Sequence, residues 1–132
     1  MCLFCKIING EIPSYKVYED EDTLAFLDIS QVSKGHTLVI PKTHCENIFD
    51  LDEKSCQKLL NTVKYVSILL KEKLNVQNIN IINNNGSVAG QVINHFHIHI
   101  LPRHENDNIK IHTPGNDFNA DTLKSTLNEL TK

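Results

Sequence analysis

Hydrophobic positions recur along this chain with two periods, one typical of strands and one typical of a helix. Over residues 52–74 they recur every three or four residues, which predicts a long helix with Asp52 as its N-cap. A shorter amphipathic segment at 121–130 also has a helical pattern. Alternating or β-branched runs predict five strands, at residues 16–19, 23–27, 37–40, 79–82 and 95–101.

The order of these segments indicates the fold class. Strands come first, the long helix follows, and two more strands come after it, which favours an antiparallel α+β domain over a parallel βαβ arrangement. We therefore expect a five-stranded antiparallel sheet with one long helix and a short C-terminal helix. Pro102 is expected to end the last strand. The segment 4–9 is short and ends at Gly10, and no element is assigned to it.

Composition narrows the function classes. The chain has 132 residues without an internal repeat or linker, so residues 1–132 are expected to form a single domain. Its 13 Lys and Arg against 16 Asp and Glu give a net charge of −3, so nucleic acid is not an expected partner. We find no apolar run near the roughly 18 residues of a membrane span and no signal sequence, which predicts a cytoplasmic protein without a membrane partner.

Three histidines alternate with apolar residues in the last predicted strand. Successive side chains of a strand point to opposite faces, so His95, His97 and His99 are expected on one surface while Phe96 and Ile98 face the core. A half-exposed strand that merely carries histidine is the simpler interpretation, but three of the 7 histidines in this alternation favour a functional site. Imidazole can act near neutral pH as base, acid, nucleophile or metal ligand.

The loop before this strand, residues 83–91, is rich in groups that can donate hydrogen bonds. It contains Asn84, Gly86, Gly90 and Gln91. Backbone and amide N–H groups of this kind hold phosphate oxygens. Phosphate chemistry is therefore the leading expectation for the histidine surface.

These features resemble the histidine triad family of nucleotide hydrolases and transferases, in its Hint-like branch. The resemblance covers almost the whole chain and rests on four blocks, at residues 4–13, 24–29, 35–42 and 95–101. The last block, in which histidine and apolar residues alternate, is the most specific. The Fhit-like branch, which favours dinucleoside polyphosphates, lacks the zinc residues discussed below and is the weaker match.

The resemblance implies a role for each residue of the site. His97 corresponds to the nucleophile that attacks the α-phosphorus and forms a covalent nucleotidyl-histidine, which water then hydrolyses. His99 and Gln91 complete the implied catalytic set as hydrogen-bond donors to phosphate oxygens, and Asp28 corresponds to the carboxylate that binds the ribose hydroxyls. The other implied nucleotide-binding residues are Ile7, Phe26, Ile29 and Leu38 around the purine base, and Asn84, Gly90 and Val92 in the phosphate loop.

Val92 departs from the family pattern. Animal-type Hint enzymes carry at this position a serine that contacts the leaving group. Protonation of the leaving group and a preference for phosphoramidates therefore do not follow from the resemblance at Val92.

Cys2 and Cys5 form a Cys-x-x-Cys pair that has two interpretations. A thioredoxin-like redox pair would follow a strand, and no strand is predicted before Cys2. The resemblance to bacterial members instead implies a structural zinc ion held by this pair together with His44 and His95. His44 follows the predicted strand 37–40 and His95 begins the last strand, so the four residues are expected to meet at one end of the sheet.

Together with these residues, the resemblance implies a hydrolase that cleaves purine nucleoside 5′-phosphoramidates, or related nucleotidyl esters, at the α-phosphorus and releases the monophosphate. The resemblance also implies a homodimer joined through the long helix and a sheet edge. Three alternatives remain open: a dinucleoside polyphosphate hydrolase or nucleotidyltransferase that uses His97, a nucleotide-binding scaffold without turnover, and a zinc module whose histidines are all ligands. His36, in the turn before strand 37–40, is expected to be structural.

Overall fold

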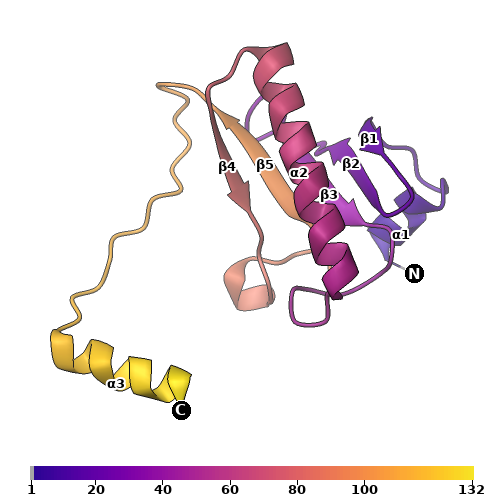
Figure 1. The fold of residues 1–132 in the computed structure, drawn as a ribbon. Coiled ribbons are helices and arrows are strands. Elements are labelled where there is room, and N and C mark those ends of the chain that lie inside the picture. The colour runs from indigo at the N-terminus through magenta and orange to yellow at the C-terminus, as the bar shows by residue number, and fades with distance from the viewer. Residues whose placement is uncertain (1) are drawn as a thin grey trace.

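Five antiparallel strands in the order β1-β2-β3-β5-β4 form the sheet of this protein, whose computed structural model describes residues 2–132 (Figure 1). This arrangement confirms the predicted α+β fold. In chain order the elements are α1 (Leu3–Ile8), β1 (Lys16–Glu19), β2 (Thr23–Leu27), β3 (Thr37–Pro41), α2 (Glu53–Leu74), β4 (Asn78–Ile82), the 3-10 helix η1 (Ser87–Ala89), β5 (Ile98–Arg103) and α3 (Ala120–Thr131).

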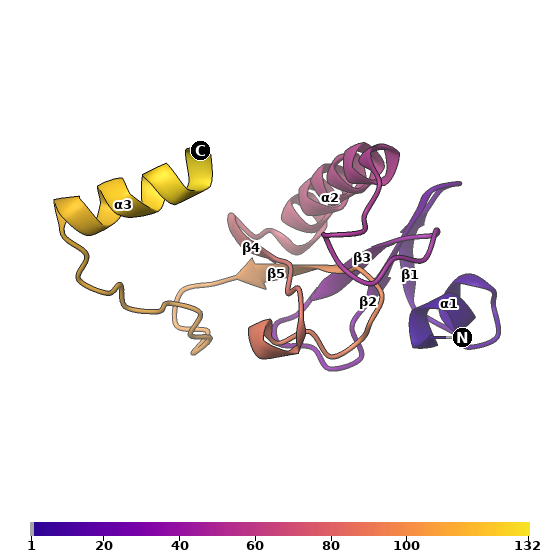
Figure 2. The ribbon, with the colours of Figure 1, turned by 90° about the horizontal axis from the view of Figure 1, so that it is seen from below.

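The long helix α2 covers one face of the sheet (Figure 2). The Asp52 side chain caps it by accepting a hydrogen bond of 2.7 Å from the Ser55 backbone N–H. Its apolar stripe, with the spacing that the sequence predicts, packs on inward-facing side chains of β2, β3 and β5. The buried residues of this core are Ala25, Val39, Cys45, Leu59, Val63, Val66, Leu70, Phe96 and Ile100.

The opposite face of the sheet carries α1, a helix that the sequence analysis did not assign. Phe4 and Ile7 of α1 pack on Leu24 and Phe26 of β2 and form a second core. Cys2 caps the helix, because its Sγ accepts a hydrogen bond of 3.2 Å from the Cys5 backbone N–H. A helix of six residues is too short to show a hydrophobic period, and its burial against the sheet stabilises it.

The predicted bounds of the last strand, 95–101, are wrong. Strand β5 runs over Ile98–Arg103. The chain before it turns toward the segment after β3, where the Phe96 N–H donates to the Cys45 carbonyl over 2.8 Å. Pro102 lies within the strand, opposite Ile79 of β4. The pairing of β5 with β3 ends at Ile100, so β5 pairs with β4 alone at Pro102, and a proline is tolerated there as at a sheet edge.

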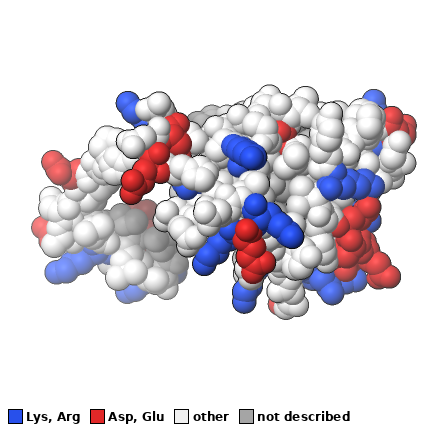
Figure 3. Space-filling model, turned by 90° about the horizontal axis from the view of Figure 1, so that it is seen from above, with Lys and Arg blue, Asp and Glu red and all other residues white. Residues whose placement is uncertain are grey.

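The last part of the chain leaves the sheet. Residues 110–132, called the C-terminal arm below, are all exposed and run through an extended segment to α3 (Figure 1). Among residues 2–132, no helix combines the length and apolar character required to cross a membrane. On the face seen in Figure 3, acidic and basic side chains are interspersed.

Candidate active site and metal centre

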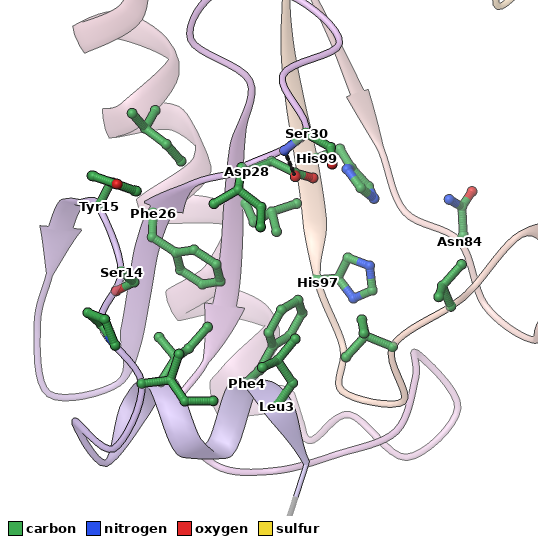
Figure 4. A pocket seen from close by; sticks show the side chains of 18 of the residues that line it. Leu3, Phe4, Ser14, Tyr15, Phe26, Asp28, Ser30, Asn84, His97 and His99 are labelled. Atoms are coloured by element: carbon green, nitrogen blue, oxygen red, sulfur yellow. Dashed lines mark hydrogen bonds between the residues drawn. The ribbon is translucent and has the colours of Figure 1, made fainter.

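A pocket of about 550 Å³ opens on the α1 side of the sheet, a size typical of small-molecule sites. One side is apolar and is formed by α1, the segment after it and Phe26 of β2 (Figure 4). The other side is polar and carries His97, His99 and Asn84. A ligand with an apolar ring at one end and a charged group at the other matches this division.

The structure brings most of the predicted nucleotide-binding residues to this pocket. Those that line it are Ile7, Phe26, Asp28, Ile29, Leu38, Asn84, Gly90, Val92, His97 and His99. Strands β2, β3 and β5 hold the central members side by side, because Phe26 pairs with Leu38 and Leu38 pairs with His99 in the sheet register.

Gln91 lies outside the lining of the pocket. Its buried side chain donates from Nε2 to the carbonyl oxygens of Glu46, at 2.6 Å, and Ile93, at 3.0 Å. Its Oε1 accepts from the Gly86 N–H at 2.8 Å. The amide thereby fixes the loop 86–91, and it has no amide hydrogen left for a ligand in this arrangement. In this structure the Gln91 side chain supports the loop 86–91.

The backbone determines which nitrogen of His97 is unprotonated. Its Nδ1 lies 2.7 Å from the carbonyl oxygen of His95. Because a carbonyl only accepts hydrogen bonds, Nδ1 carries the proton and Nε2 carries a free lone pair. The His97 ring is buried but lines the pocket, so this lone pair is a nucleophile available to a bound ligand.

A second histidine, His36, determines where the proton of His99 lies. The Val32 N–H donates to His36 Nδ1 over 3.3 Å, so the proton of His36 is on Nε2. That Nε2 lies 2.9 Å from His99 Nδ1 and donates to it. His99 therefore carries its own proton on Nε2. The result is a chain of hydrogen-bond donors. His99 presents an N–H group to the pocket, and its neighbour His97 presents a lone pair.

His36 is expected from the sequence to be structural, and that expectation does not include its contact with His99. The position of His36 in the sequence does indicate this contact, because His36 lies two residues before Leu38 and so shares a sheet face with it. Leu38 pairs with His99, which places the two imidazoles on the same face of neighbouring strands.

Burial keeps this histidine pair uncharged at neutral pH. The pKa of His99 is lowered to about 4, mainly by burial and further by the nearby His97 and His36. Burial also lowers the pKa of His36, although Asp28 Oδ2, 3.5 Å from its Nε2, opposes that effect. The other Asp28 oxygen accepts from the Ser30 N–H at 2.8 Å (Figure 4). The chain of hydrogen bonds requires both rings to be neutral, because a second proton on either ring would occupy the Nδ1 atom that accepts.

Four residues from three separate parts of the sequence meet at the N-terminus of α1. The Sγ atoms of Cys2 and Cys5 and the Nδ1 atoms of His44 and His95 all lie within 4.8 Å of one another. Each sulfur lies 3.3 to 3.6 Å from each of these nitrogens, and the two nitrogens are 3.1 Å apart. This is the set of four residues that the sequence analysis predicted as a metal site.

The donor set fits a tetrahedral zinc ion. Zn–S bonds of about 2.3 Å and Zn–N bonds of about 2.0 Å place sulfur and nitrogen ligands about 3.5 Å apart, close to the separations found here. His95 is oriented for this use, because its Nε2–H donates to the Pro41 carbonyl over 2.9 Å and leaves the Nδ1 lone pair directed at the cluster. Four protein ligands complete a tetrahedral shell, as in structural sites.

The chain is similar to proteins of one family. The HIT domain model matches residues 9–106. Protein hit of Bacillus subtilis is 52% identical over 103 residues, which are 78% of this chain and 71% of that protein. Adenosine 5′-monophosphoramidase hnt1 of Schizosaccharomyces pombe is 38% identical over 130 residues, 98% of this chain and 95% of that protein.

Solved structures of proteins from the same family also match this chain. The crystal structure of a HIT family member from Bacillus subtilis matches with a TM-score of 0.92 at 42% identity, covering 98% of this chain and 94% of that one. A zinc-bound histidine triad family protein from Mycobacterium smegmatis matches with a TM-score of 0.79 at 32% identity, covering 98% and 94%. The chain belongs to the HIT domain family.

Proposed function

We propose that this protein hydrolyses purine nucleoside 5′-phosphoramidates, or related nucleotidyl esters, at the α-phosphorus through a covalent intermediate on His97. The observation that carries the proposal is the free lone pair on His97 Nε2, which Nδ1 donation to the His95 carbonyl fixes in place. A relative named as an adenosine 5′-monophosphoramidase supports the choice of substrate.

The proposed reaction has two displacements. In the first, His97 Nε2 attacks the α-phosphorus, the new N–P bond forms, and the amine leaves with a proton from water. In the second, a water oxygen forms a bond to the α-phosphorus as the N–P bond to His97 breaks, and the proton that this water loses neutralises the hydroxide left by the first step. The nucleoside monophosphate departs and His97 Nε2 regains its lone pair. The His99 Nε2–H donates to a phosphoryl oxygen in both steps and stabilises the charge that develops there.

The remaining lining residues support binding of a nucleotide. The base fits the apolar side of the pocket, where Phe4 and Phe26 meet edge to face with ring centroids 5.5 Å apart. Asp28 has one oxygen committed to Ser30 and a second that can accept from a ribose hydroxyl. Val92 is exposed at the rim of the pocket and offers the leaving group no polar contact.

We also propose that zinc occupies the Cys2–Cys5–His44–His95 site. When bound, it supplies a structural cross-link and leaves no position open for water. The residues themselves join α1, which forms the apolar side of the pocket, to the segment that carries His97. The protein is further proposed to form a homodimer.

The test is hydrolysis of a fluorogenic adenosine 5′-phosphoramidate by the zinc-loaded wild type and His97→Ala. We expect kcat to fall by about three orders of magnitude or more, equivalent to about 4 kcal/mol. Quenching the wild type during turnover should give an adduct with the mass of one added adenylyl group. His112→Ala, which removes an exposed histidine of the arm, is the matched control and should keep full activity.

Other outcomes separate the alternatives. Turnover of a dinucleoside polyphosphate with none of the phosphoramidate would favour a polyphosphate hydrolase that uses the same His97. If AMP binds but neither substrate is hydrolysed, the proposal is wrong and the pocket belongs to a binding protein.

A further inference from the structure

Asp28, His36 and His99 bring one metal-ligating atom each together at the polar side of the pocket. Asp28 Oδ2 lies 3.5 Å from His36 Nε2, and this nitrogen lies 2.9 Å from His99 Nδ1. All three atoms lie within 4.8 Å of one another, and Figure 4 shows Asp28 and His99 at the same end of the pocket. Two imidazole nitrogens and one carboxylate oxygen form the donor set of the facial triad that holds divalent iron in many enzymes.

The separations fit bonds to one ion. Histidine nitrogens and carboxylate oxygens bind a first-row metal at about 2.0–2.2 Å. Two nitrogens 2.9 Å apart then subtend an angle of about 90° at the ion, and an oxygen 3.5 Å from one of them subtends about 110°. Such angles place the three ligands on one face of a coordination shell, and the other positions are left to water or to a further ligand.

The backbone holds two of the ligands together before any ion binds. The Asp28 N–H donates to the His36 carbonyl at 3.0 Å, and Gln31 Nε2 donates to the same carbonyl at 2.8 Å. Asp28 Oδ1 accepts from the Ser30 N–H at 2.8 Å, which fixes the carboxylate. The third ligand, His99, is positioned by the pairing of β5 with β3. An ion therefore meets ligands that are already ordered, which lowers the cost of binding.

A bound ion takes the place of a proton between the two histidines. His36 Nε2 carries the hydrogen that it donates to His99 Nδ1. When this proton moves to His36 Nδ1, the ring stays neutral and both facing nitrogens present lone pairs. His36 Nδ1 then no longer accepts from the Val32 N–H, and the cost is small because that hydrogen bond is long, at 3.3 Å.

We propose that Asp28, His36 and His99 form a second metal site for a divalent first-row transition ion, and that the bound ion excludes the ribose of a nucleotide. The exclusion follows from the carboxylate. Its Oδ1 is held by Ser30, so the ion and a ribose hydroxyl compete for Oδ2. The site shares no ligand with the proposed zinc site. The metal site rests on geometry alone, whereas the exclusion rests on the proposed function.

Titration of cobalt(II) chloride into the zinc-loaded protein tests the site, because zinc already occupies the cysteines. Equilibrium dialysis should find one cobalt per chain beyond the zinc. Its spectrum should show weak visible d–d bands without the ultraviolet sulfur-to-cobalt band that cysteine ligands produce. His36→Gln and Asp28→Asn should each weaken cobalt binding by about 100-fold or more, since even groups outside the coordination shell contribute about 10- to 100-fold. The control His112→Gln removes an exposed imidazole and should leave cobalt binding unchanged.

NMR of the wild type locates the ion without any variant. Cobalt(II) is paramagnetic, so less than one equivalent should broaden the imidazole signals of His36 and His99 before those of His112. Absence of cobalt beyond the zinc would overturn the metal site. So would binding seen only with a sulfur-to-cobalt band, or binding that folded Asp28→Asn and His36→Gln both retain.

Nucleotide competition tests the exclusion. AMP at ten times its own Kd should weaken cobalt binding by about tenfold, because mutually exclusive ligands compete by mass action. At equal occupancy 2′,3′-dideoxy-AMP should compete less, since it lacks the hydroxyls that Asp28 accepts from, and it also controls for cobalt held by phosphate in solution. Equal competition by both nucleotides, or none by bound AMP, would overturn the exclusion.

The outcomes separate this inference from the proposed function. If AMP does not bind the cobalt-free protein, the proposed function fails and the exclusion fails with it, while the cobalt titration still decides the metal site. Loss of hydrolysis in His97→Ala is measured without cobalt and does not depend on the second metal site.

Discussion

Replacing His36 by phenylalanine tests whether the buried histidine pair places the proton of His99. The change keeps a ring in a site that is 3% exposed but removes the Nε2–H that donates to His99 Nδ1 over 2.9 Å. A buried acceptor without its donor costs about 1–3 kcal/mol, so the form of His99 protonated on Nε2 loses its advantage and the form protonated on Nδ1 becomes populated. Nε2 then faces the pocket without a hydrogen. At about 1.4 kcal/mol per tenfold in rate, we expect kcat for the phosphoramidate to fall by about 10- to 100-fold.

Two further measurements distinguish this effect from general damage to the pocket. His36→Gln restores an N–H donor near the same position, so it should recover most of the activity. His36 also contributes to the lowering of the His99 pKa to about 4, although burial is the larger cause. Without His36 that pKa rises, so His99 becomes protonated at a higher pH and the acid limb of the kcat profile should move upward in the phenylalanine variant.

The nitrogen chemical shifts of His99, measured by NMR, report the tautomer directly. The wild type should show a protonated Nε2 and the phenylalanine variant a protonated Nδ1. If the phenylalanine variant keeps the wild-type tautomer and a kcat within about twofold of the wild type, His36 does not place the proton and the reasoning is refuted.

Three further predictions concern stability. Chelation of zinc should lower Tm by about 10 °C or more in the wild type, as scanning calorimetry can show, and should have no further effect on His44→Ala. Gly35→Ala should lower the unfolding free energy by about 2–4 kcal/mol in urea titrations, because a Cβ there would lie 2.5 Å from a leucine methyl of α2 and φ is +94°. Gly10→Ala, where φ is +79° and a Cβ would meet no atom within 4 Å, should cost only about 1 kcal/mol. The hydrogen bonds that Asp107 accepts from Arg103 and from backbone N–H groups hold its pKa well below its usual range, so Asp107→Asn should lower Tm at pH 7. Because the folded state binds this proton less readily than the unfolded state, the Tm difference should shrink as pH falls below about 4.

Much of the fold follows from local periodicity. The apolar stripe of α2 matches the buried face of that helix, and the continuous apolar or β-branched runs of β2 and β3 match strands that are buried on both faces. The six residues of α1 show no period, and their helix depends on the Cys2 cap and on the sheet beneath Phe4. The late start of β5 depends on the bond from Phe96 to Cys45, a contact across 51 residues that no local pattern contains.

The candidate site also has a part that the sequence predicts and a part that it does not. Alternation placed His97 and His99 together, and the family resemblance supplied part of the remaining lining. Lining residues that neither supplied are Leu3, Phe4, Ile12, Pro13, Ser14, Tyr15, Leu27, Ser30 and Ile93. The parts that escaped prediction are hydrogen bonds between segments. Gln91 faces the loop because its amide satisfies Glu46 and Gly86, and His36 faces His99 because of the register of β3 with β5. Residue type alone does not distinguish a side chain that contacts a ligand from one that supports its neighbour.

The contact between Cys2 and His95 spans 93 residues, and this has a consequence for synthesis on the ribosome. A chain grows from its N-terminus at about 5–20 residues per second, so the two cysteines are made about 5–20 seconds before His95. During that interval they remain exposed to oxidants and to other metals. The apolar wall of the pocket comes from residues 3–38 and the histidine wall from residues 84–99, so the pocket can be complete only after the second of these segments has been made.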